Sequence, residues 1–134
     1  MIQNTLDRMI PVIPPENVWV ITNENHASET CRQLKTMGFC PSRLLTEPVG
    51  RNTAAAIGYS ASILSKIDPD AIMAVFPADH TIATPKGFCE LLKQAETIAT
   101  NNHLVTLGIN PTTPETGYGY IKQGQALDFR SKEH

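Results

Sequence analysis

Apolar residues in this sequence recur with the spacing of helices in some stretches and as short continuous runs in others. Apolar positions three or four residues apart predict a first helix over residues 2–10, which Pro11 should end. We expect Asn25 to cap the second helix and Gly38 to terminate it. The three later helices are predicted over residues 27–37, 52–67 and 85–98.

Continuous apolar runs, several of them rich in β-branched residues, predict the strands. They lie at Val18–Thr22, Arg43–Thr46, Ala71–Phe76, Leu104–Ile109 and Tyr118–Lys122. The run at 71–76, which follows a predicted turn at residues 68–70, is apolar throughout and should be a fully buried strand. Strands that alternate with helices predict an α/β fold with a mostly parallel sheet flanked by helices. The polar tail, residues 123–134, is expected to fray.

Composition narrows the class of protein. The chain has 134 residues, which suits one domain or part of one, with 41% hydrophobic residues, 18% charged residues and a net charge of −2. This balance predicts no nucleic-acid partner and no anionic lipid surface, and no apolar run is long enough for a membrane helix. Three cysteines without metal-ligand spacing predict reduced thiols in a cytoplasmic protein.

The first segment with candidate chemistry runs from Glu47 to Ile57. A strand is predicted to end there, Gly50 permits a tight turn, and small residues open a helix. Free backbone N–H groups at a helix start favour an anion or the edge of a ligand, and Asn52 offers both a donor and an acceptor to a base such as guanine. The alternative is an ordinary cap, with the Asn52 side chain holding the helix.

The second segment is Val75–His80. Asp79 follows the most apolar predicted strand and therefore falls at the ligand edge of an α/β sheet. A carboxylate there can hold Mg²⁺ that bridges phosphate oxygens, or it can simply bond its own backbone in a turn. We expect a structural role for His80, although contact with a phosphate is an alternative.

The third segment, Thr106–Ile121, contains two prolines and three glycines, and this composition predicts a long, defined loop beside a strand. Gly119 would let the backbone approach a sugar ring closely, and Tyr118 and Tyr120 would line that ring. Ordinary loop packing is the alternative.

Taken together, three stretches resemble the sugar-1-phosphate nucleotidyltransferases, and specifically the mannose-1-phosphate guanylyltransferases. They are Glu47–Ile57, Phe76–Ile82 and Leu107–Lys122, and Pro14–Thr22 also reads like that family's second strand with its lead-in. The resemblance covers nearly the whole chain. It implies a Rossmann-like nucleotide-diphospho-sugar transferase fold, of which residues 1–134 would form a part.

The resemblance also implies an activity and its site. Mannose 1-phosphate would attack the α-phosphorus of GTP, giving GDP-mannose and releasing pyrophosphate. By matching motif positions, Asp79 would be the catalytic metal ligand for Mg²⁺. The nucleotide would lie near Gly50, Arg51, Asn52 and Thr53, and the mannose near Tyr118 and Gly119. No nucleophile is assigned, and a homo-oligomer is one of the expected forms.

This sequence departs from the family at its start. The family opens with a glycine-rich, arginine-containing segment that binds the triphosphate, and no such segment precedes the first predicted helix. We therefore expect an internal piece of the enzyme, inactive by itself. A non-catalytic or regulatory module that binds nucleotide sugars is the alternative. A hydrolase that uses Asp79 and His80 is a weaker one, because neither an activated nucleophile nor a second carboxylate accompanies them.

Overall fold

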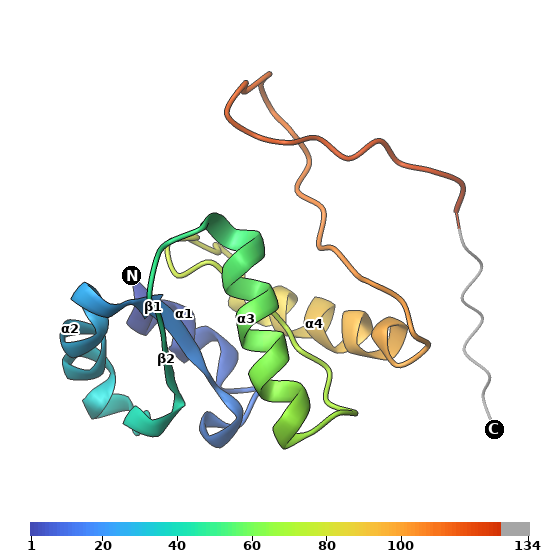
Figure 1. Ribbon diagram of the computed structural model, residues 1–134. Helices are drawn as coiled ribbons and strands as arrows, with labels where there is room; N and C mark the ends of the chain where they lie inside the picture. The colour runs from blue at the N-terminus through green and yellow to red at the C-terminus, as the bar shows by residue number, and fades with distance from the viewer. Residues whose placement is uncertain (127–134) are drawn as a thin grey trace.

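The computed structural model describes residues 1–126, which form an α/β arrangement around two parallel strands (Figure 1). β1 (Val20–Asn23) pairs with β2 (Leu44–Glu47), and Val20 lies opposite Leu44. Parallel neighbours need a crossover, which α2 (Glu24–Leu34) provides together with two short 3₁₀ helices, η2 (Lys35–Met37) and η3 (Pro41–Arg43). The predicted class, parallel strands flanked by helices, is confirmed. The other elements are α1 (Ile2–Met9), η1 (Pro15–Asn17), α3 (Asn52–Ile67) and α4 (Pro85–Ala99).

The helix ends show where local sequence decides structure. The sequence predicts that Gly38 terminates the second helix. α2 itself ends at Leu34, and Gly38 ends the short 3₁₀ helix η2 that continues it, where it adopts the left-handed conformation with φ of 75°. The prediction that Asn25 caps α2 is wrong. Asn23 is the cap, and its side-chain oxygen accepts a hydrogen bond from the Asn25 backbone N–H at 2.9 Å. The strand therefore passes directly into the helix, which begins at Glu24, three residues earlier than predicted.

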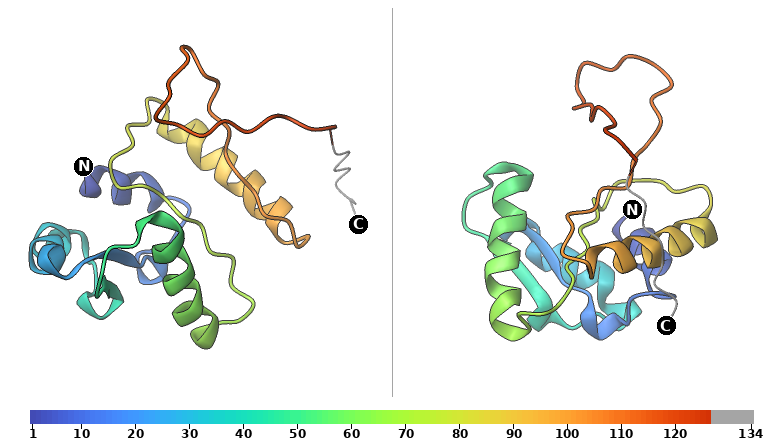
Figure 2. Two further views of the ribbon diagram at one scale, coloured as in Figure 1. Left: turned by 45° about the horizontal axis from the view of Figure 1, so that its top comes forward. Right: turned by 90° about the vertical axis from the view of Figure 1, so that its right-hand side faces the viewer.

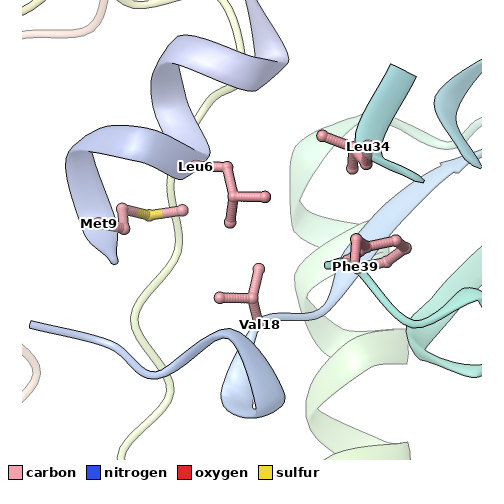
Figure 3. Packing of buried hydrophobic residues seen from close by; sticks show 5 residues of the cluster. All are labelled: Leu6, Met9, Val18, Leu34 and Phe39. Carbon is pink, nitrogen blue, oxygen red and sulfur yellow. The ribbon is translucent and has the colours of Figure 1, made fainter. Parts of the chain in front are cut away.

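The core lies between α1, α2 and the start of β1 (Figure 3). Its buried members are Leu6, Met9, Val18, Leu34 and Phe39. Leu34 is fully buried at the end of α2, and Leu6 and Met9 point at it and its neighbours from the apolar face of α1. The core is small, so most of the described residues outside these elements remain partly accessible to solvent.

α3 occupies the residues predicted for it, but it contributes less to the core than its apolar stripe suggests. Ile57, Ala61 and Leu64 are only half-buried, Ala54 is exposed, and the helix has no fully buried residue. Within residues 1–126, no helix combines the length and the apolar character needed to cross a membrane.

The prediction of a fully buried strand at Ala71–Phe76 is wrong. Within residues 1–126 this segment pairs with neither β1 nor β2, and Ile72 and Val75 are 44% and 50% exposed. A strand needs a neighbour to satisfy its backbone groups, and apolar composition alone does not supply one. Phe76 is the exception, because it is half-buried against the core.

The predicted strands at Leu104–Ile109 and Tyr118–Lys122 are likewise absent from the described part of the chain. Residues 104–126 leave the end of α4 and run as an extended arm away from the helices (Figures 1 and 2). Leu104 is fully exposed and Ile121 is 81% exposed, so neither run packs on a sheet. The tail predicted to fray is described only to residue 126, and residues 127–134 lie outside the described part.

Candidate functional site

Asp79 lies on the loop between the apolar run 71–76 and α4, at the mouth of a small pocket. The pocket has a volume of about 170 Å³, and the start of α1 forms its opposite wall. Asp79 and His80 are both exposed there, so the carboxylate is accessible to a ligand. The lining residues are Met1, Asn4, Arg8, Asp79, His80, Thr81, Ile82 and Pro85.

Two buried polar side chains of α1 hold the backbone on either side of Asp79. The Thr5 hydroxyl donates to the Ala78 carbonyl at 3.2 Å, and Arg8 Nη1 donates to the His80 carbonyl at 3.2 Å. Arg8 Nη2 also donates to Thr5 Oγ1 at 3.1 Å, which links the two donors. Sequence reasoning missed both residues. Their only signal is that two polar residues, one turn apart, share the face of α1 that carries the core residues.

The Arg8 guanidinium is itself held by α4. It lies over the Phe88 ring, with 5.4 Å from Cζ to the ring centroid, and Phe88 meets Phe76 edge to face at 5.8 Å. The Cys89 thiol donates to the Arg8 carbonyl at 3.4 Å. These contacts join α1, α4 and the end of the apolar run 71–76 into one support for the Asp79 loop.

Asp79 is the residue at this pocket that could hold Mg²⁺. This ion prefers oxygen ligands and is commonly held by one or two carboxylates while substrate phosphates and water complete its shell. Asp79 offers one accessible carboxylate at the pocket. Among residues 1–126 there is no cluster of three or more His, Cys, Asp or Glu side chains that could hold a metal ion. A metal bound at Asp79 would therefore need further ligands from a phosphate or from water.

The predicted nucleotide-binding residues, Gly50–Thr53, lie at the start of α3. Arg51 occupies the N-cap position and makes no side-chain hydrogen bond to the helix. Asn52 has a left-handed backbone with φ of 66°, a conformation that few residues other than glycine adopt. The alternative in which Asn52 acts as an ordinary side-chain cap is wrong, because Arg51 is the N-cap and no side chain makes a capping hydrogen bond to the exposed first turn of α3.

The predicted sugar-binding residues, Tyr118 and Gly119, lie on the extended arm, where both are exposed. The arm has local order of its own. The Tyr120 hydroxyl accepts from the Glu115 N–H at 2.7 Å and donates to the Glu115 carbonyl at 3.0 Å, and the Glu115 carboxylate accepts from the Gly117 N–H at 3.0 Å. Tyr120 is thus engaged in shaping the loop, which leaves Tyr118 as the aromatic ring with the larger exposed fraction.

The three predicted segments do not form a single cavity in the described part of the chain. The Asp79 pocket is lined by none of Gly50–Thr53 and by neither Tyr118 nor Gly119. Asp79 is instead brought together with α1, which sequence reasoning did not place at the site.

Comparison with known proteins identifies the family. The model of the nucleotidyl transferase family matches residues 1–132. The chain is 42% identical over 129 residues to a mannose-1-phosphate guanylyltransferase of Salmonella muenchen, covering 95% of this chain and 27% of that protein. It is 41% identical over 129 residues to one of Escherichia coli, covering 95% and 28%. It is also 42% identical over 124 residues to the xanthan biosynthesis protein XanB of Xanthomonas campestris pv. campestris (strain B100), covering 92% and 26%.

The chain therefore spans about a quarter of the length of these relatives. The family match extends over nearly all of the 134 residues and includes every segment singled out above. The predicted family is confirmed: this chain belongs to the nucleotidyl transferase family.

Proposed function

We propose that the chain forms part of a guanylyl-transfer site that makes GDP-mannose from GTP and mannose 1-phosphate. In this reaction a phosphate oxygen of mannose 1-phosphate bonds to the α-phosphorus of GTP, and the bond to the leaving pyrophosphate breaks. One observation carries the proposal. An identity of about 40% runs through 95% of the chain to relatives named for this activity, and it spans all three candidate segments.

The start of α3 is proposed to bind the nucleotide. Its first-turn N–H groups carry no side-chain cap, and the helix dipole adds partial positive charge at that end. The left-handed backbone of Asn52 costs some energy, and strain of this kind persists where the surroundings impose it, often at binding sites. Asn52 would pair with the guanine edge, with Gly50, Arg51 and Thr53 around it.

Asp79 is proposed to hold Mg²⁺ at the pocket beside α1. When bound, the metal would neutralise charge on the phosphate oxygens during transfer. The chain's own contribution is to place one carboxylate at a fixed position, so that the phosphates are oriented before the reaction. Tyr118 and Gly119 are proposed to contact the mannose. Gly119, which has nothing near the position a Cβ would take, leaves room for a close sugar.

The cytoplasm is the proposed location. Cys31, Cys40 and Cys89 are all free thiols, as expected in a reducing compartment. The proposed small-molecule partners are GTP, mannose 1-phosphate and GDP-mannose.

A segment exchange tests the function. The matching segment of the Salmonella muenchen relative is replaced by this chain, and formation of the nucleotide-diphospho-mannose product and of pyrophosphate is measured with GTP, ATP and UTP as donors. We expect GDP-mannose from GTP and far slower transfer from the other nucleotides. A folded exchange protein that binds GTP but transfers nothing would favour a non-catalytic binding module instead. GTP hydrolysis without mannose 1-phosphate would favour a hydrolase.

In a second part of this experiment, the chain is assayed by itself. Because it spans about a quarter of its relatives, we expect it to lack part of the charge stabilisation that the reaction needs. Such losses cost roughly a thousandfold or more in rate. Turnover by the chain alone at the rate of the exchange protein would contradict this expectation.

A further inference from the structure

We propose that Thr5 and Arg8 act as positioning residues for Asp79, and we call this pair the α1 clamp. The inference rests on the proposed role of Asp79 as a metal ligand. It assigns a task to two buried polar residues that contact the Asp79 loop only through its backbone.

The clamp acts on the peptide planes around Asp79. The carbonyl of Ala78 belongs to the plane that carries the Asp79 Cα atom, and this carbonyl accepts from Thr5. The His80 carbonyl, one residue beyond Asp79, accepts from Arg8. Fixing both carbonyls leaves the Asp79 backbone little freedom, although the residue lies on an exposed loop outside any helix or strand.

The support behind the clamp is rigid. Thr5 and Arg8 are 5% and 9% exposed, and their neighbours on α1, Leu6 and Met9, belong to the core cluster. A position fixed by a packed helix is held more precisely than one fixed by a loop, which is what a metal ligand requires. Through these two hydrogen bonds, the packed helix α1 therefore restricts the position of the exposed Asp79 carboxylate.

Burying the charged Arg8 side chain is energetically unfavourable, so it is a poor choice if its role is only to stabilise the fold. Within the described residues it forms no ion pair, and its Nε atom is buried with no hydrogen-bond partner. Arg8→Met keeps a side chain of similar length beside Phe88 while it releases the His80 carbonyl. The melting temperature of this variant is measured alongside. Loss of order at residues 79 and 80 in a variant that remains folded is then assigned to positioning and not to unfolding.

The first test measures the mobility of the backbone at Asp79 and His80. In the 134-residue chain, ¹⁵N relaxation gives the order parameters of the Asp79 and His80 amides. We expect about 0.8 in the wild type and below about 0.6 in Thr5→Val, which keeps the shape of threonine but loses its hydroxyl. Thr5→Ser should restore the wild-type value. Gln3→Met is the matched control, because it removes a different α1 side-chain bond, to the Gln33 carbonyl at 2.7 Å.

The second test measures how the rate depends on the Mg²⁺ concentration. In the exchange protein described above, Thr5→Val should raise the Mg²⁺ concentration for half-maximal rate by about tenfold, the effect of about one net hydrogen bond. Thr5→Ser should reverse this shift. A residue needed only for folding would lower the melting temperature without moving the Mg²⁺ dependence. In an Asp79→Asn background, Thr5→Val should cause no further shift.

The outcomes distinguish this inference from the proposed function. Unchanged order parameters at residues 79 and 80 in Thr5→Val and in Arg8→Met would overturn the clamp, as would an equal effect of Gln3→Met. If Asp79→Asn keeps the wild-type rate and Mg²⁺ dependence, the metal role of Asp79 fails. A loss of order in the two clamp variants would then still establish that α1 holds the loop.

Discussion

Among substitutions remote from the site, Leu34→Ala should lower the free energy of unfolding the most. Among the larger side chains of the described residues, only that of Leu34 has no surface exposed to solvent. It packs where α2, β1 and α1 meet. At about 0.8 kcal/mol for each buried carbon removed, transfer alone accounts for about 2.4 kcal/mol. The cavity left behind raises the expected loss to about 3–4 kcal/mol, within the range usual for buried leucines.

The free energy of unfolding is measured by urea titration followed by circular dichroism. Since small domains have about 5–15 kcal/mol in total, this loss should lower the urea midpoint substantially. Leu104→Ala is the matched control, because it makes the same chemical change at a fully exposed residue and should cost less than about 0.5 kcal/mol. Equal losses for the two variants would refute this reasoning. They would show that Leu104 is packed and that the strand predicted at 104–109 exists after all.

Two further predictions concern ionisable groups outside the site. Hydrogen bonds from Arg32 and Gln33 lower the pKa of the Glu29 carboxyl from 4.5 to about 2, so the support it gives α2 should be present above pH 4.5 and lost as the pH falls toward 2. A ¹³C-detected titration of Glu29 in wild type and Arg32→Gln checks this, and an identical midpoint in both proteins would contradict it. The Ser42 hydroxyl, 3.0 Å from the Cys40 thiol, lowers the pKa of that exposed thiol. At neutral pH Cys40 should therefore react faster with an alkylating reagent than an ordinary exposed thiol does, and Ser42→Ala should slow it; no change in rate would contradict the assigned hydrogen bond.

The elements that the sequence predicts well are those fixed by local interactions. α3 begins and ends as predicted because its helical pattern is bounded by the turn at 68–70. The helical segment formed by α2 and η2 ends at Gly38, whose left-handed backbone could be anticipated from residue type. β1 and β2 pair across one short crossover, so their partnership is also nearly local.

The errors arise where structure depends on distant partners. The apolar run at 71–76 has the composition of a central strand, but whether it becomes one depends on a neighbouring strand, and composition does not report this. The clamp was missed for a similar reason. Nothing local to Thr5 or Arg8 indicates that their hydrogen-bond partners lie more than seventy residues away. Residue type and motif order point to Asp79, which is exposed at a pocket, and its role as a metal ligand stays a prediction.

The charge of Asp79 is the feature on which the proposed function depends most. Asp79→Asn keeps nearly the same shape but removes the negative charge that Mg²⁺ prefers, and Asp70→Asn makes the same change on an exposed turn away from the pocket. The measurement is kcat of both variants in the exchange protein across a Mg²⁺ titration, with thermal melts alongside. We expect Asp79→Asn to lower kcat by at least about a hundredfold at an unchanged melting temperature, and Asp70→Asn to behave as wild type. Wild-type kcat and Mg²⁺ dependence in Asp79→Asn would show that Asp79 is a turn residue and would contradict the proposed site.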